Sequence, residues 1–199
     1  FFQLAEQYYN EEDVVRAVAF RPGGHELASA GAYGEIRIWT TADWKQSRAL
    51  RMRDKASSLA FSADGRLLAC GGNSDHLIGP RARVAVWDFE SGEAIGRVGL
   101  DEAGWIDDVA FSSDGKFLLG VGQQKPRVAL WDAAAWDAEP RRFEGSCAAL
   151  ATHSPLLAIG VSKAVRLVDA TTGKETRDID LGLAVRCVAV SATGELIGA

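Results

Sequence analysis

Histidine and cysteine are the side chains of this sequence that could bind a metal ion or act as nucleophiles. The chain has three of each, namely His25, His76, His153, Cys70, Cys147 and Cys187. None of the histidines has a Cys, Asp or Glu at ligand spacing on the same predicted element, whereas a zinc site needs about four converging ligands. We therefore interpret the histidines as solvated turn residues and expect no metal site.

The cysteines are expected to be buried free thiols, because each falls within a predicted strand and unpaired Cys behaves as a small hydrophobic residue. Their odd number argues against a disulfide framework. This pattern favours a reducing compartment, and we expect a cytoplasmic protein.

Two glycine-containing segments could bind phosphate groups, but each lacks essential parts of a phosphate site. Gly71-Gly72 follows a predicted strand without the third glycine and the helix of a dinucleotide site. Thr172-Gly173-Lys174 lacks the upstream glycine of a phosphate loop, and Glu175 stands where Ser or Thr is needed. No G-x-S-x-G or H-E-x-x-H motif occurs. We expect no catalytic residues and no cofactor, and so a protein that is not an enzyme.

These residues lie within a sequence that repeats, so the elements formed by the repeat must position them. Each copy has an opening apolar run, a Gly-containing turn and a closing run; the pattern occurs four times and begins a fifth. The openings are VVRAVAFRPGG (14–24), ASSLAFSADG (56–65), IDDVAFSSDG (106–115), CAALATHSP (147–155) and VRCVAVSATG (185–194). The closings are EIRIWT (35–40), RVAVWD (83–88), RVALWD (127–132) and AVRLVD (164–169). A fixed repeat of this kind decides the architecture.

The spacing of the repeat distinguishes a constant connection from a variable one. From each closing residue to the next opening run there are 22, 24, 21 and 22 residues, counted from Trp39 to Phe61, Trp87 to Phe111, Trp131 to Thr152 and Val168 to Val190. Within the copies, the spans from opening to closing residue are 19, 26, 20 and 16 residues. The second copy therefore contains an insertion.

The runs are predicted to be β-strands, because large and small or apolar and charged side chains alternate within them. Ile36-Arg37-Ile38 shows this alternation, and Asp64-Gly65 and Asp114-Gly115 suit tight hairpins. Each copy divides into four strands. Regularly spaced short strands in copies of about 40–45 residues that end in Trp-Asp favour a β-propeller.

The segments resemble the blades of WD-repeat β-propellers. The dipeptide that names the family is intact at Trp87-Asp88 and Trp131-Asp132, whereas the first and fourth copies have Trp39-Thr40 and Val168-Asp169. No copy has the Gly-His dipeptide of the family before its first strand, so the buried hydrogen-bonded tetrad of the family is expected to be absent or replaced. The resemblance implies blades held mainly by apolar packing.

The fold class is thus predicted to be all-β, with four blades of four antiparallel strands and the first half of a fifth. We expect a lead-in or linker segment at 1–13 and a partial propeller at 14–199, with blades at about 14–53, 54–100, 101–145, 146–182 and an incomplete 183–199. Propellers of this family commonly have about seven blades of roughly 42 residues. We therefore expect part of a larger propeller, within a bacterial-type multidomain protein; a partner chain that completes the ring and a small five-bladed ring closed by 2–9 are the alternatives.

The resemblance also implies a candidate partner-binding surface. In blades of this family, the connections between the second and third strands lie on the same face as the connections between blades. The insertion Gly72–Arg81 and the run Leu100–Asp108 fall on such connections in neighbouring blades. The candidate residues are Asp75, His76, Ile78, Arg81, Asp101, Glu102, Trp105 and Asp107, with Gln123, Gln124 and Lys125 one blade further on. An aromatic residue ringed by charges is typical of an interface hot spot; the alternative is that Trp105 packs beneath the inserted loop.

The opposite face carries a second candidate. Trp44 and Trp136 each lie five residues after a closing Trp, where the other two copies have Gly92 and Gly173. They could form an aromatic contact pair, or each could cover the end of its own blade. A basic stretch on the outermost strand of blade one, containing Lys45, Arg48, Arg51, Arg53 and Lys55, is interpreted as protection of a sheet edge or as a site for an acidic partner.

The bulk composition narrows the partner class. Hydrophobic residues make up 47% and charged residues 25% of the chain, which suits a soluble globular domain. The net charge of −5 makes nucleic acid an unfavourable partner, and no apolar run is long enough to span a membrane. We predict a non-catalytic protein-interaction scaffold or sensor module with protein partners or further blades. The alternative is an enzyme or small-ligand propeller whose active groups lie in blades outside this chain.

Overall fold

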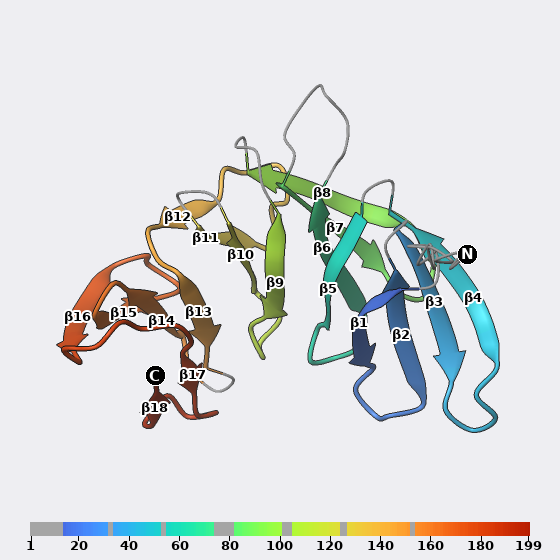
Figure 1. Ribbon diagram of the computed structural model, residues 1–199. Coiled ribbons are helices and arrows are strands. Elements are labelled where there is room, and N and C mark those ends of the chain that lie inside the picture. Colours follow the sequence, from blue (N-terminus) through green and yellow to red (C-terminus); the bar gives the residue numbers. More distant parts are fainter. Residues whose placement is uncertain are drawn as a thin grey trace, which may run out of the picture.

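The structure is a computed structural model and consists of β-sheets arranged in an arc. It describes residues 14–31, 34–52, 55–73, 82–100, 105–123, 127–151 and 154–199. Every regular element in these ranges is a strand, and the strands form four four-stranded sheets and one two-stranded sheet. Figure 1 shows the sheets side by side around the arc. The predicted all-β class, built from four-stranded antiparallel blades, is confirmed.

Each blade is a meander in which consecutive strands pair. Blade one contains β1 (Val15–Phe20), β2 (Glu26–Gly31), β3 (Glu35–Thr40) and β4 (Gln46–Arg51). Blade two contains β5 (Lys55–Phe61), β6 (Leu67–Asn73), β7 (Ala82–Asp88) and β8 (Ala94–Leu100). Blade three contains β9 (Ile106–Phe111), β10 (Phe117–Gly122), β11 (Val128–Asp132) and β12 (Arg141–Phe143). Blade four contains β13 (Cys147–Leu150), β14 (Leu156–Val161), β15 (Ala164–Asp169) and β16 (Glu175–Asp180), and the fifth sheet contains β17 (Ala189–Val190) and β18 (Ile197–Gly198).

In blades two and three, a Ser-x-Asp-Gly turn fixes the hairpin between the first two strands. In blade two, the Ser62 hydroxyl donates to Asp64 Oδ1 at 2.6 Å and accepts from the Leu67 N–H at 2.9 Å. Gly65 has a φ of +68°, which glycine adopts without steric cost. Blade three repeats the turn, with Ser112 Oγ 2.7 Å from Asp114 Oδ1. These turns set the register of the hairpins.

The core lies between blades rather than within a single one. In β3, Ile36 and Ile38 are fully buried while Arg37 between them is exposed. The two isoleucines belong to the same apolar cluster as Leu68 and Phe89 of blade two. Burial of each such side chain contributes roughly 1.5–3 kcal/mol. Similar clusters join blades two and three, blades three and four, and blade four and the fifth sheet.

Polar support for the closing tryptophan remains in blade one. The Trp39 indole N–H donates to Ser29 Oγ at 2.8 Å. At the register position of Ser29, blade two has Cys70 and blade three has Gly120. A Cβ on Gly120 would lie 2.7 Å from the Trp131 ring, which therefore fills this space itself. Apolar packing thus replaces a hydroxyl–indole contact at this position of blade three.

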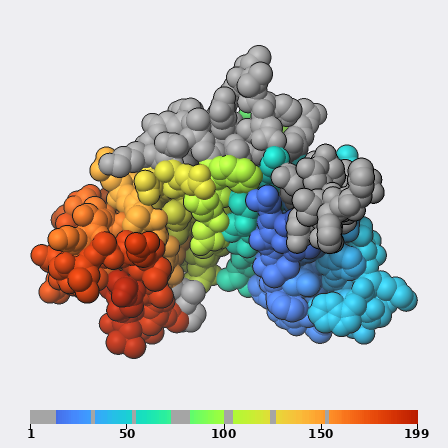
Figure 2. All heavy atoms as spheres, viewed as in Figure 1, coloured from blue at the N-terminus to red at the C-terminus, as the bar shows by residue number. Residues whose placement is uncertain are grey.

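The two ends of the arc expose apolar side chains. Val18 and Phe20 of β1 are 59% and 60% exposed, whereas Leu59, the blade-two equivalent of Val18, is 9% exposed. At the other end, Leu183 and Leu196 are exposed. Figure 2 shows blade one in blue and the C-terminal residues in red at the two ends of the arc.

Three expectations from the sequence need correction. Cys70 is buried, but Cys147 is half-buried and Cys187 is exposed and lies outside any strand. Lys55 is not on the outermost strand of blade one, because it begins β5 of blade two. The side chain of Arg48 does not simply protect a sheet edge, because it reaches across to blade two and donates to the carbonyls of Phe89 and Glu90. In the described part of the chain, no helix has the length and hydropathy of a membrane span.

Candidate interaction surface

Trp105 is held against a cation from another blade. It directly precedes β9 of blade three and is half-buried. The guanidinium of Arg16, on β1 of blade one, lies over its ring with Cζ 5.6 Å from the ring centroid. The contact therefore spans blade two, because β5 lies next to both β1 and β9. A cation–π contact of this kind is worth about 0.5–1 kcal/mol at an exposed site.

Gln123 fixes the polar side of the same surface. Its amide Nε2 donates to Asp107 Oδ1 at 2.9 Å, and its backbone N–H donates to the Trp105 carbonyl at 3.0 Å. Both Asp107 and Gln123 are exposed, so their remaining hydrogen-bonding capacity faces solvent. We call Arg16, Trp105, Asp107 and Gln123 the Trp105 surface.

Hydrogen bonds between blades two and three support this surface from beneath. The Ser58 hydroxyl lies 3.0 Å from Asp108 Oδ1 and accepts from the Val109 N–H at 3.1 Å. The Ser57 hydroxyl lies 2.9 Å from the Gly71 carbonyl and also contacts the Ile106 carbonyl. Because these side chains cross the boundary between blades, they fix the position of β9 and so of the Trp105 surface.

The structure brings together three of the predicted residues: Trp105, Asp107 and Gln123. The others, Asp75, His76, Ile78, Arg81, Asp101, Glu102, Gln124 and Lys125, lie outside the described residues, and their part in a site stays a prediction. The inserted loop does connect the second and third strands of blade two, since β6 ends at Asn73 and β7 begins at Ala82. Sequence reasoning missed Arg16, which only the contact between distant blades reveals.

Trp44 occupies a glycine position on the opposite face. Its φ is +56°, and its N–H donates to the Thr40 carbonyl at 2.9 Å. Gly92 makes the same bond to the Asp88 carbonyl and has a φ of +73°. The Trp44 side chain is 59% exposed, so packing within the chain does not explain the presence of a bulky residue there.

Trp136 does not share this geometry, so the two tryptophans are not an equivalent pair. Its φ is not among the positive values of the described residues. Its side chain packs against blade two, where a Cβ on Gly96 would lie 2.9 Å from the indole. The reason is that the two turns have different hydrogen bonds. In blade three the Ala135 N–H donates to the Asp132 carbonyl and the Ala138 N–H donates to the Ala135 carbonyl, whereas in blade one the N–H of Trp44 itself donates to the carbonyl four residues before it.

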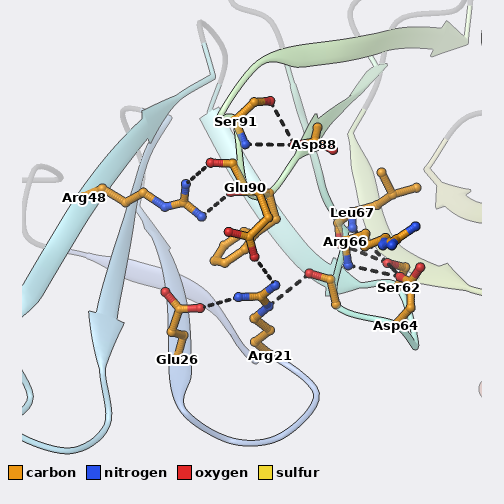
Figure 3. Close-up of polar contacts among 12 residues, drawn as sticks. Arg21, Glu26, Arg48, Ser62, Asp64, Arg66, Leu67, Asp88, Glu90 and Ser91 are labelled. Atoms are coloured by element: carbon orange, nitrogen blue, oxygen red, sulfur yellow. Dashed lines mark hydrogen bonds and ion pairs between the residues drawn. The ribbon is translucent and has the colours of Figure 1, made fainter.

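Two arginines of blade one cover Phe89 of blade two. The Cζ atoms of Arg21 and Arg48 lie 4.5 Å and 4.1 Å from the centroid of its ring. Arg48 donates to the backbone carbonyls of Phe89 and Glu90, so this basic side chain joins blades (Figure 3).

Arg21 makes polar contacts to both blades (Figure 3). It donates to Glu26 Oε2 at 2.7 Å and to the Gly65 carbonyl at 3.0 Å, and it also pairs with Glu90. Its hydrogen bond to Glu26 raises the pKa of the guanidinium. Arg21 therefore stays charged and ties the first hairpin of blade one to blade two.

No metal-binding cluster of three or more His, Cys, Asp or Glu occurs among the residues that the structure describes. The arrangement of the Trp105 surface offers an aromatic face, a carboxylate, an amide and a guanidinium. These groups can contact and hydrogen-bond a partner.

The fold and this surface define an arc of β-propeller blades that carries a candidate contact site. Residues 4–40 and 48–78 match the family model described as WD domain, G-beta repeat. Two solved structures have the same fold. The β-propeller domain of Cps50 (Swd1) from Myceliophteria thermophila has a TM-score of 0.74 at 17% identity, and a chain of the mitotic checkpoint complex has a TM-score of 0.72 at 20% identity. The alignments cover 92% and 88% of this chain.

Curated relatives match over shorter lengths. Cilia- and flagella-associated protein 52 of Chlamydomonas reinhardtii is 37% identical over 86 residues, or 43% of this chain. Nuclear distribution protein PAC1 of Arthroderma otae is 30% identical over 125 residues, or 60% of this chain. Together with the fold, these matches confirm the predicted resemblance to the WD-repeat β-propeller family.

The chain covers only part of each of these proteins. It spans 14% of the Chlamydomonas protein and 26% of the Arthroderma protein, and 60% and 54% of the two solved chains. Both curated relatives come from eukaryotes, so the comparisons give no support to the expectation of a bacterial-type protein.

Proposed function

We propose that this chain is a non-catalytic protein-interaction module that docks a partner on the Trp105 surface. The observation that carries the proposal is the contact of Arg16 with Trp105, because it holds a large aromatic side chain in place across three blades. Rigid aromatic residues with a polar surround are typical hot spots of protein interfaces.

The polar groups around Trp105 would give the contact its specificity. Asp107 and Gln123 are exposed and joined by a hydrogen bond, so they present a fixed acceptor and amide to a partner. The sequence predicts that the inserted loop between β6 and β7 lies on the same face as Trp105. We propose that residues of this loop extend the contact area.

The comparisons support the choice of a protein as partner. One solved structure of this fold is a chain of an assembly, the mitotic checkpoint complex. We also propose a cytoplasmic location, which the three free cysteines support because unpaired thiols persist in reducing compartments.

The test compares the proteins retained by immobilised wild type, Trp105→Ala and Trp44→Gly, measured by quantitative mass spectrometry. Trp44→Gly is the matched control, because it removes an exposed tryptophan at the opposite end of the blades. Loss of a hot-spot residue costs about 2 kcal/mol or more, so a partner should bind Trp105→Ala roughly 30-fold more weakly. Equal retention by a folded Trp105→Ala would rule out this surface.

A further inference from the structure

A cavity of about 600 Å³ lies at the boundary between blades three and four and also borders Ala63, in the first turn of blade two. We call it the seam cavity; its wall includes Ser112, Asp114, Phe117, Leu150, Pro155 and Ala170. It lies on the face opposite to the Trp105 surface, because β9 begins directly after Trp105 and ends directly before Ser112. A six-residue strand separates the two sites by about 20 Å.

The repeat shows which residues stand at the same place between blades one and two. The N–H of Ser112 donates to the Phe117 carbonyl, as the N–H of Arg21 donates to the Glu26 carbonyl. These bonds make Ser112 the equivalent of Arg21.

A second pair of bonds aligns the facing blades. The N–H of Ala170 donates to the Pro155 carbonyl, as the N–H of Phe89 donates to the Arg66 carbonyl. Ala170 is therefore the equivalent of Phe89.

Between blades one and two, this space is filled from within the chain. The guanidinium of Arg21 lies over the Phe89 ring and donates to the Gly65 carbonyl. Between blades three and four, serine and alanine replace the arginine and the phenylalanine, and the space stays open.

The boundary between blades two and three differs from the seam cavity in the aromatic residues that accompany its small ones. It has Ser62 and Ala133 at the two equivalent positions. There, the aromatic side chains of Phe111 and Trp136 pack into the apolar cluster that joins the two blades. The repeat aligns Phe111 with Thr152 of blade four, a smaller residue that lies outside the described residues.

The described wall of the seam cavity is amphipathic and has no unbalanced charge. Its only charged side chains are Asp114 and Lys116, which pair with each other at 3.1 Å. The apolar part includes Phe117, Leu150, Pro155 and Ala170, and the polar part consists mainly of the hydroxyls of Ser112, Ser113, Ser154 and Thr171. Such a wall suits a flat, uncharged group that has an apolar body and a hydrogen-bonding edge.

We propose that the seam cavity is a binding site for a tyrosine side chain of a protein partner. The ring would fill the space that Arg21 and Phe89 fill between blades one and two, and the phenol would hydrogen-bond to the hydroxyl groups of the wall. The volume lies within the range of about 300–1,000 Å³ for ligand sites and leaves room for the flanking residues of a peptide. This site is independent of the Trp105 surface.

The test uses N-acetyl-L-tyrosinamide as the probe and follows its binding by ligand-observed NMR, with N-acetyl-L-argininamide as the charged control. A probe of this size is expected to bind with a Kd of about 1 mM. The arginine probe should not compete, because the cavity offers no free carboxylate among its described lining residues.

Two variants close the cavity in different ways. The double substitution Ser112→Arg with Ala170→Phe copies the arrangement between blades one and two. Ala63→Trp puts a bulky side chain at an exposed turn position of the cavity wall, where folding should tolerate it. Ala192→Trp makes the same change in the equivalent turn of the fifth sheet and is the matched control. Each closing variant should weaken tyrosinamide binding at least tenfold, whereas Ala192→Trp and Trp105→Ala should leave it unchanged.

The interpretation of each binding result depends on whether the variant is folded. Circular dichroism first shows whether each variant is folded, and if the double variant is not, Ala63→Trp alone decides. Absence of binding to the wild type, or equal binding to Ala63→Trp, would overturn the tyrosine site. Neither result would bear on the Trp105 surface, because that surface is tested by a different variant and a different measurement.

Discussion

The guanidinium of Arg21 in blade one lies over the ring of Phe89 in blade two, with Cζ 4.5 Å from the ring centroid. The contact joins two blades at the hairpin end of the sheets, where apolar packing gives way to solvent. It places a charged group in partial burial, and carboxylates from both blades compensate that charge. The same side chain thus serves as packing surface and as polar link, which the small residues at the seam cavity do not.

Replacement of Arg21 by Ala should destabilise the protein by about 1–3 kcal/mol, because charge-assisted hydrogen bonds and the packing on Phe89 are lost together. Urea unfolding followed by circular dichroism measures the change. Arg37→Ala is the matched control, because Arg37 pairs with Glu35 of its own strand at an exposed site. Such exposed pairs contribute about 0–1 kcal/mol. Equal losses in the two variants would contradict a special role of Arg21.

Trp44→Gly should be at least as stable as the wild type, in spite of the loss of a large side chain. The φ of +56° costs a residue with a Cβ about 1–2 kcal/mol relative to glycine. Trp44→Ala keeps that cost and removes the ring, so it should be less stable than Trp44→Gly by about 1 kcal/mol. Thermal unfolding of the three proteins measures the order. If Trp44→Ala were the more stable of the two variants, the backbone at this position would not be strained.

Sequence periodicity predicted the strands well. The alternation of apolar and charged residues at Ile36, Arg37 and Ile38 indicates a strand by itself, without information about neighbouring blades. Periodicity also predicted Trp44 at a glycine position, since the two residues share a spacing from the closing residue. The same reasoning failed for Trp136, because blade three has one more residue between Trp131 and Arg141 than blade one has between Trp39 and Arg48. That extra residue changes the hydrogen bonds of the turn.

Contacts between blades could not be predicted from a single copy of the repeat. Arg16 was not recognised because its partner, Trp105, comes from a blade two positions further along the arc. Arg48 was interpreted as edge protection or as part of a site for an acidic partner because its strand is the outermost one of blade one, whereas the side chain is long enough to reach the carbonyl of Phe89. The wall of the seam cavity includes two small residues, Ser112 and Ala170, which are informative only when equivalent positions of facing blades are compared.

Gly72→Ala should destabilise the protein by about 3 kcal/mol, because a Cβ there would lie 2.0 Å from the Lys55 carbonyl oxygen and the backbone must shift. Gly72 pairs with Ala56 in the register of β5 and β6, so the change would disturb the first two strands of blade two. Urea unfolding measures the loss. Gly198→Ala is the control, because a Cβ at that position meets no atom within 4 Å. A loss at Gly72 no larger than at Gly198 would show that the strands can separate without cost.

The turn carboxylate of Asp64 should make stability fall in acid. Its hydrogen bonds from the Ser62 hydroxyl and the Arg66 N–H hold the pKa of Asp64 below its ordinary value. A carboxylate whose pKa is lower in the folded state stabilises the protein above the unfolded pKa of about 3.9, and this contribution is lost as the pH falls through the folded pKa. Urea unfolding of wild type and Asp64→Asn at neutral pH and at about pH 3 should therefore give a difference that shrinks in acid. In a Ser62→Ala background the hydroxyl donor is absent, so the pH dependence of that difference should be weaker. A difference that stays constant with pH would show that the turn does not favour the ionised carboxylate.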